Sequence, residues 1–387
     1  MGRPTFGFGM YFTYSRMVLD HEDLAKAYDF EYFNSRMNDF GVPGIDMPNN
    51  MPTAALPMLP IAWLNASLAK SIWTVLSVGM FFWSLKRLFL VFEIPTFQNL
   101  GLGLVAFAFL FRPAYDGIAL GQMYFLILWL LVLSIPVKSS DKGPQVFLPL
   151  AIAFVIKGYG LVQLLWFAVR RNHRVLMMGM ICGLLVVLFS LPLVGFNSWG
   201  RFLNLILSEA ASAKGAHVSY QSINGLLHHF LTYDAVWSHS PLLTLPDWVV
   251  AIVSVVVNIL LIAIVVKLSP ALDSSHVPLS YAATIAAGVV TYPMASEYHY
   301  VMFLPLIFGL AKTIQQHRSP ALVSRSFVAV VAISSVIMAL PIKYQGLQPA
   351  EPIIGFLAYP RLYAGLCLIL CYVFLMRRIK TQELRTE

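Results

Sequence analysis

Eleven apolar runs constrain this 387-residue chain more than any other feature. A transmembrane helix needs about 20 mostly apolar residues, and fewer when neighbouring helices shield it from lipid. The runs approach or reach that length, and they cover residues 70–85, 95–112, 121–137, 144–156, 158–169, 175–195, 247–266, 278–293, 298–311, 327–341 and 356–376. The pattern predicts an all-α, polytopic membrane protein with about 10–11 apolar helices. The runs 144–156 and 158–169 are too short for two lipid-facing spans, so a broken or bent pair inside the bundle is expected there.

Composition supports the membrane assignment. Apolar residues make up 58% of the chain and charged residues only 11%, against about 25% in soluble domains. The mean hydropathy is +0.73. A soluble globular protein is excluded, and the high apolar content without a low-complexity tract also excludes a disordered one. The net charge of +8 comes from basic residues beside the apolar runs, so no nucleic-acid partner is expected.

The distribution of Lys and Arg predicts the orientation, because cytoplasmic loops are enriched in these residues. The tail 377–387 is basic and is expected in the cytoplasm, in a multi-pass protein of the cell (plasma or inner) membrane. Alternation of the runs then places two loops on the outer face, the N-terminal loop 1–69 and the large loop 196–246, with interfacial helices in the second. We expect a single membrane domain over residues 1–387.

The N-terminal stretch 1–69 raises a difficulty for this topology. Export of a long polar segment without a preceding helix is unusual, and Gly7–Leu19 is too short and polar to span. One explanation is that a first transmembrane helix belongs upstream. The alternative is that Gly7–Leu19 lies along the membrane interface as an anchor.

Common cofactor and metal motifs are absent from the sequence. It contains no phosphate-binding GxxxxGK[ST] loop, no GxGxxG fingerprint, no HExxH and no GxSxG. A DxD pair, which would clamp a nucleoside diphosphate through a metal, is also missing. We therefore expect no cofactor and no metal site. The three cysteines lie inside apolar runs, as packing residues do: Cys182, Cys367 and Cys371.

Two polar segments near the N-terminus carry candidate chemistry. Asp29 begins an Asp-Phe-Glu-Tyr string, and Asn50 precedes a proline-started apolar helix. A carboxylate held at the bilayer surface is a candidate general base, because an attacking hydroxyl must lose its proton. The alternative is a solvated loop charge. Gln122, at the end of an apolar helix, either binds a ligand or makes a helix–helix contact.

Three further segments place polar residues beside apolar runs. Lys157 lies at the bend of the short pair, where its ammonium either faces a bound anion such as phosphate or extends to the membrane surface. Gln221 and Asn224 introduce a predicted amphipathic helix. Glu297 and His299 lie in a polar-aromatic knot between two apolar runs, and a structural Glu297–Lys/Arg pair is the alternative to a functional role.

Taken in order, these segments resemble glycosyltransferase family 87. The resemblance extends from about Asp29 to Tyr300, and it rests on short motifs in the expected order: Asp29-Phe30 with Tyr32, Asn50-x-Pro52-Thr53, Gly121-Gln122, Lys157, Gln221-Ser222, and Glu297-Tyr298-His299-Tyr300. Tyr220 stands where the family has Asn, and Met51 where a second Pro is common. The resemblance implies a GT-C-type membrane enzyme.

The resemblance also implies the reaction. One sugar, most often mannose, would move from a polyprenyl-phosphate donor, a co-substrate, to a hydroxyl of a glycolipid or glycan acceptor on the outer face, with inversion and without a metal. Asp29 would be the general base and Lys157 would neutralise the phosphate. The remaining residues would bind sugar or phosphate, with Glu297 orienting His299: Asn50, Gln122, Gln221, Asn224, His299 and Tyr300.

Two other functions stay open from the sequence. A lipid-linked sugar transporter or flippase would need polar residues along the middle of the membrane, whereas those here cluster at helix ends. The second open possibility is that the chain is a non-catalytic, degenerate paralogue of such an enzyme.

Overall fold

The computed structural model describes residues 6–42, 44–46, 50–137, 143–210, 216–269, 275–316, 323–347 and 352–386. Within these ranges the chain is helical, and the only extended pairing is an isolated bridge between Asp234 and Ser238. Each apolar run coincides largely with a helix. The predicted all-α membrane architecture is therefore confirmed.

Four helices are long and apolar enough to cross a membrane: α3 (Ala66–Val91), α9 (His173–Val194), α12 (Asp247–Lys267) and the Pro360–Thr381 part of α17 (Pro360–Thr386). A fifth candidate is the pair α4 (Asn99–Leu110) and α5 (Arg112–Leu120), bent by 43°. The apolar segments of α9 and α12 are only 22% buried within the protein. Their remaining surface is available to lipid chains, as in a multi-pass membrane protein.

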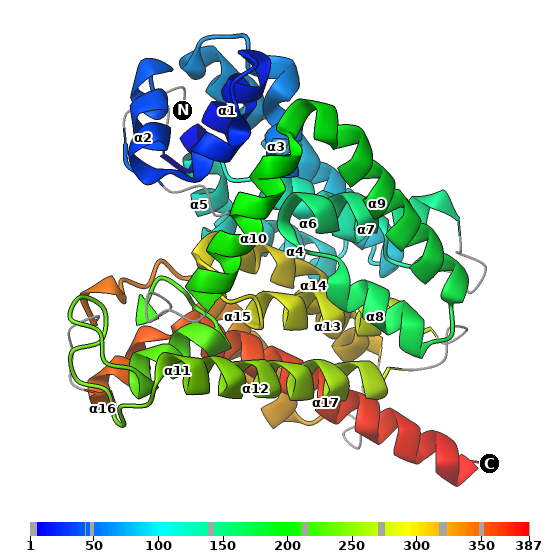
Figure 1. Cartoon of the computed structure of the whole chain (residues 1–387). Helices are drawn as coiled ribbons and strands as arrows, with labels where there is room; N and C mark the ends of the chain where they lie inside the picture. The colour runs from blue at the N-terminus through cyan, green and yellow to red at the C-terminus, as the bar shows by residue number, and fades with distance from the viewer. Residues whose placement is uncertain are drawn as a thin grey trace.

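Four shorter apolar helices are mostly buried in the bundle: α6 (Tyr124–Leu133), α7 (Pro144–Lys157), α13 (Val277–Val290) and α14 (Leu304–Gln316). Two others, α8 (Leu161–Val169) and α15 (Arg325–Ala339), are buried on one side and expose apolar side chains on the other. The core is centred on α13, in which every residue except Gly288 is buried. This helix packs against α8, α12, α14 and α17 (Figure 1). A helix that is apolar on all sides needs such a protein environment.

The N-terminal stretch, predicted as a loop, is mostly helical. It forms α1 (Phe6–Leu19), the 3₁₀ helix η1 (Leu24–Tyr28), α2 (Phe30–Asp39) and the 3₁₀ helix η2 (Pro52–Ile61). An interfacial anchor would expose one face of α1. Residues 7 to 15 are instead all buried, and the helix packs against η2. The anchor interpretation is wrong because aromatic residues lie on every side of this helix.

The loop 196–246 contains the two predicted helices, α10 (Phe196–Ala210) and α11 (Ile223–Leu231). The hydroxyl of Ser222 accepts a hydrogen bond from the Gly225 amide and caps the start of α11, as the polar-then-apolar pattern predicts. Helix α10 packs against η1 and connects the N-terminal helices with the rest of the molecule (Figure 1). The shortest elements, η5 (Gln345–Leu347), α16 (Pro352–Gly355) and η6 (Phe356–Ala358), precede α17.

The predicted break between residues 156 and 158 is a tight turn. Helix α7 ends at Lys157, and two glycines with positive φ follow, Gly158 at +72° and Gly160 at +107°. Glycine adopts these angles without a steric penalty. The turn brings α8 back beside α7 and keeps both helices inside the bundle.

Gly160→Ala is expected to lower the free energy of unfolding by about 1–3 kcal/mol, the range for a strained backbone position. A Cβ there would lie 2.8 Å from the Leu150 carbonyl oxygen, at a φ that L-residues avoid. Gly79→Ala is the control, because that helical glycine in α3 has no atom near the added methyl and gains helix propensity. Thermal unfolding in detergent measures both, and equal stability of the two variants would contradict the prediction.

Candidate active site

The Lys157 ammonium is buried among aromatic rings. Its side chain is 7% exposed, and Nζ lies 5.1 Å from the ring centroid of Tyr11 and 5.2 Å from that of Tyr124. Within the described ranges, no hydrogen bond or ion pair of this ammonium is found, although the Asp46 carboxylate acts on it electrostatically. The Lys157 side chain therefore does not extend to the surface, and that alternative from the sequence is wrong. Burial lowers the pKa of Lys157 to about 7, and an anion bound beside it would raise this pKa and stabilise the charged form.

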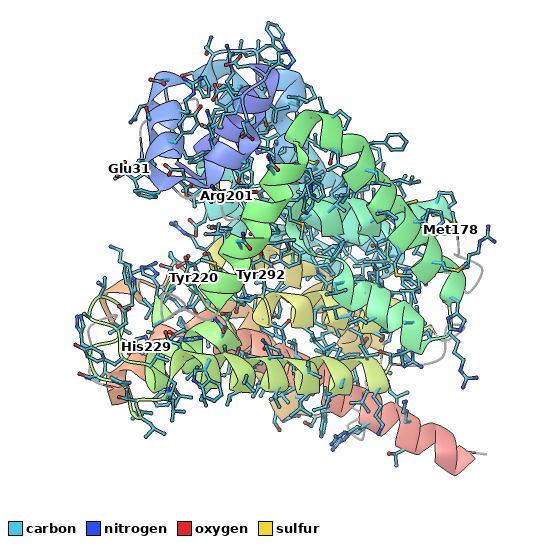
Figure 2. The ribbon with its side chains drawn as sticks, in the orientation of Figure 1. Glu31, Met178, Arg201, Tyr220, His229 and Tyr292 are labelled. Atoms are coloured by element: carbon cyan, nitrogen blue, oxygen red, sulfur yellow. The ribbon has the colours of Figure 1, made fainter. Side chains whose placement is uncertain are left out.

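The rings around Lys157 come from distant segments and form what we call the tyrosine cluster: Tyr11, Tyr124, Tyr159, Tyr292, Tyr298 and His299. They arise from α1, the start of α6, the glycine turn, and the segment from the end of α13 into the 3₁₀ helix η4 (Glu297–Phe303). Figure 2 shows Tyr292 among the side chains in the centre of the molecule. The sequence prediction named His299 as a site residue and placed Tyr298 in the motif around it, but it gave no individual role to any tyrosine of this cluster.

His299 is fixed within the cluster by two contacts. Its ring centroid lies 3.9 Å from that of Tyr124, and its Nδ1 lies 2.9 Å from the Tyr159 hydroxyl. Burial and the nearby Lys157 ammonium together hold the pKa of His299 well below its ordinary value. The imidazole is therefore neutral at pH 7, with one nitrogen protonated and the other an acceptor.

Gln122 is attached to the cluster through Tyr11. The Tyr11 hydroxyl donates a hydrogen bond of 3.1 Å to Oε1 of the Gln122 amide, which is buried. Helix α5 ends two residues earlier at Leu120, and the Lys70 ammonium donates hydrogen bonds to the Ile118 and Ala119 carbonyls of its last turn. Gln122 therefore makes the helix–helix contact that the sequence offered as one alternative. Its binding of a ligand stays a prediction.

Glu297 does not orient His299, contrary to the prediction. Its Oε2 lies 3.0 Å from Nη2 of Arg361, a fully buried guanidinium at the start of α17. Burial raises the pKa of Glu297, but the Arg361 charge and the hydrogen bonds of Tyr344, Arg361 and Asp116 together lower it below its ordinary value. The structural Glu–Arg pair is therefore the correct alternative, and Tyr159 is the hydrogen-bond partner of His299. The sequence prediction missed Arg361. Its position after Pro360, inside an apolar run, was the signal that could have identified it, because a charge there needs a partner.

Gln221 and Tyr300 belong to the same structural network. The Gln221 amide donates to the carbonyls of Val218 and Ala358, and it accepts from the Arg361 amide. The Tyr300 hydroxyl donates to the Gln221 carbonyl. Both side chains are fully buried, so the geometry gives them a structural role in place of the predicted substrate contact. Asn224 is partly buried on α11, outside the tyrosine cluster.

Arg361→Met is expected to destabilise the protein by about 3 kcal/mol, because it leaves the largely buried Glu297 carboxylate without its cation. The matched control is Arg16→Gln, which breaks the partly exposed Arg16–Asp20 pair and costs less than about 1 kcal/mol. Denaturant or thermal unfolding in detergent measures the difference. A loss for Arg361→Met no larger than that of the control would contradict the buried-pair interpretation.

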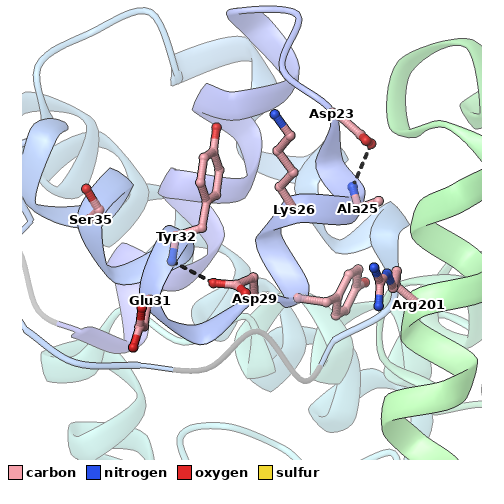
Figure 3. A pocket seen from close by; sticks show the side chains of 9 residues that line it. Asp23, Ala25, Lys26, Asp29, Glu31, Tyr32, Ser35 and Arg201 are labelled. Carbon is pink, nitrogen blue, oxygen red and sulfur yellow. Dashed lines mark hydrogen bonds between the residues drawn. The ribbon is translucent and has the colours of Figure 1, made fainter.

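Asp29 lines a polar pocket of about 800 Å³ between the N-terminal helices and α10 (Figure 3). Its carboxylate caps α2 by accepting a hydrogen bond of 2.8 Å from the Tyr32 amide, and it remains exposed. The pocket is lined by Asp23, Ala25, Lys26, Tyr28, Asp29, Glu31, Tyr32, Ser35 and Arg201. Arg201, on α10, was not predicted, because an arginine on an amphipathic helix carries no distinctive pattern.

Asn50 connects the pocket with the tyrosine cluster. The Tyr28 hydroxyl, beside Asp29 in the chain, donates to the Asn50 carbonyl at 2.9 Å. The buried Asn50 amide in turn donates to the sulfur of Met10, next to Tyr11. The structure thus gathers Lys157, His299 and, through Tyr11, Gln122, whereas Asp29 lines a pocket whose lining residues include none of these three.

Comparison with known proteins identifies the family. The model of glycosyltransferase family 87 matches residues 50–305, well over half of the chain. The matched region contains Lys157, His299 and Gln122, whereas Asp29 precedes it. No curated protein and no solved structure matches the chain. With its apolar helices and this match, the chain belongs to glycosyltransferase family 87 and is a membrane glycosyltransferase.

Proposed function

We propose that this enzyme transfers one sugar, with mannose as the first candidate, from a polyprenyl monophosphate to a hydroxyl of a glycolipid or glycan. The observation that carries the proposal is the buried Lys157 ammonium, which has ring faces around it and no directly bonded carboxylate among the described residues. Such a cation is costly to bury unless an anion completes its environment. A lipid phosphate is an anion of suitable charge and size.

Lys157 acts on the leaving group in this proposal. When the bond between the anomeric carbon and the phosphate oxygen breaks, the bond's electron pair stays with the phosphate, which gains negative charge. A fixed ammonium in a water-poor site stabilises this developing charge more strongly than water does. A monophosphate needs less compensation than a nucleoside diphosphate, which agrees with a reaction that uses no metal.

Asp29 accepts the proton of the attacking hydroxyl. The acceptor oxygen forms its bond to the anomeric carbon from the face opposite the phosphate, so the configuration inverts. Support comes from the pocket beside Asp29, whose volume of about 800 Å³ lies in the range of ligand sites. The hydrogen bond from the Tyr32 amide holds the carboxylate in place and keeps it at the pocket wall.

The membrane determines where the reaction takes place. A polyprenyl donor partitions into the bilayer, so its phosphate and sugar lie near the headgroup plane. We place this site on the outer face of the cell membrane and the basic tail in the cytoplasm, because the Lys and Arg residues follow the positive-inside pattern.

Asp29→Asn is expected to lower the rate of sugar transfer by about 10²–10⁴-fold, the usual contribution of a general base. Asparagine caps a helix as well as aspartate does, so folding should be retained. The assay follows radiolabelled sugar from polyprenyl-phosphate-mannose to extracted membrane lipids, with the protein in nanodiscs.

Asp39→Asn is the matched control, since it makes the same change on the same helix, outside the pocket, at a carboxylate paired with Arg36. This variant should keep wild-type turnover. Near wild-type turnover of Asp29→Asn would reject the role of Asp29. A folded wild-type protein that forms no product from either a mannose or a pentofuranose donor would reject the proposed reaction.

Lys157→Met is expected to lower kcat/KM for the polyprenyl-phosphate donor by at least about 100-fold, as loss of an electrostatic stabiliser does. The same change should leave the melting temperature equal or higher, because it removes a buried charge that lacks a close counter-ion. Opposite directions of activity and stability would distinguish a ligand-binding lysine from a structural one. A variant with lower stability and unchanged kcat/KM would contradict the proposal.

A further inference from the structure

The hydrogen bond between Tyr159 and His299 determines which nitrogen of the imidazole carries the proton. The Tyr159 hydroxyl is buried and lies 2.9 Å from Nδ1 of His299. Across the described segments, no other hydrogen-bond partner of this hydroxyl is found. A phenol with an ordinary pKa near 10 keeps its proton at neutral pH, and a buried hydroxyl needs an acceptor for it. The acceptor in reach is Nδ1.

The opposite arrangement would leave a buried group unsatisfied. If Nδ1 carried the proton and donated to the phenolic oxygen, the Tyr159 O–H would have no acceptor within the described residues. The imidazole is neutral, because it is buried and near the Lys157 ammonium, so it carries one N–H. With Nδ1 as the acceptor, that N–H must be at Nε2.

Packing keeps both rings in this arrangement. The Tyr159 ring stacks on Tyr292 with centroids 5.0 Å apart and an angle of 13°, while His299 lies against Tyr124. Tyr159 stands between Gly158 and Gly160, whose positive φ angles set the course of the turn. The turn that ends α7 at Lys157 therefore also positions the tyrosine that binds His299.

We infer that Tyr159 is a positioning residue that fixes His299 in the Nε2-protonated tautomer, so that the imidazole donates a hydrogen bond to the phosphate of the lipid-linked donor. The phosphate contact rests on the proposed function, whereas the tautomer rests on the structure alone. Together, Lys157 and His299 offer a cation and a neutral donor to one anion. In this tautomer His299 cannot be the general base, because its basic nitrogen is engaged by Tyr159, and the proton must go to a carboxylate.

The tautomer can be measured without substrate. The protein is prepared in nanodiscs with ring-¹⁵N-labelled histidine, and the His299 signals are those that disappear in His299→Asn. We expect a protonated Nε2 and a hydrogen-bonded, unprotonated Nδ1 in the wild type. In Tyr159→Phe, the ¹⁵N chemical shift of Nδ1 should move to the value of an unprotonated nitrogen without a hydrogen bond.

Tyr292→Phe is the control for this measurement. It removes a hydroxyl from a ring of the same cluster that stacks on Tyr159, and the described structure gives it no hydrogen bond to His299. Its His299 signals should match the wild type. A protonated Nδ1 in the wild type, or unchanged signals in Tyr159→Phe, would overturn the inference.

The functional consequence is tested with the donor itself. Tyr159→Phe should raise KM for polyprenyl-phosphate-mannose about tenfold, the effect of one lost hydrogen bond, with a smaller change in kcat. An unchanged KM would overturn the phosphate contact. Absence of transfer by the wild-type protein would overturn the proposed function instead, and the ¹⁵N signals would still decide the tautomer.

Discussion

A positive charge without a directly bonded carboxylate is the constraint around which the interior of this enzyme is organised. Water would solvate the Lys157 ammonium far better than hydrocarbon does, so the protein must supply electron-rich ring faces around it. Segments far apart in the chain contribute them: Tyr11 from α1, Tyr124 from α6, and His299 from η4. In the proposed function, binding of the donor phosphate offsets the cost of burying this charge.

The sequence was sufficient to predict the helices and part of the site. Lipid leaves the backbone no alternative to internal hydrogen bonding, so each long apolar run has to be helical. Lys157, Gln122 and His299 were found because polar residues beside apolar runs are conspicuous, and the break after Lys157 followed from the length of the two runs. These features depend on local composition, which a single sequence contains.

Other features depended on tertiary partners that no local pattern indicates. Tyrosine is common at membrane interfaces, so nothing distinguished Tyr159 from a residue of an aromatic belt until its hydroxyl was found beside His299. The family resemblance implied that Glu297 orients His299, but the Glu297 charge is compensated by Arg361, sixty-four positions away. Helix α1 was not predicted, because its aromatic residues show no one-sided periodicity.

The short helices of the core have a consequence for how a lipid reaches the enzyme. Helices α7 and α13 have 14 residues each and are therefore about 21 Å long. That length is roughly 9 Å less than the hydrocarbon thickness of a bilayer. Lys157 ends one of them and Tyr292 closely follows the other. In the proposed orientation, with the opposite helix ends at the cytoplasmic surface, the tyrosine cluster would lie beneath the outer headgroup plane. A lipid phosphate would descend into a local depression of the membrane to reach it, and thinner bilayers should shorten that descent.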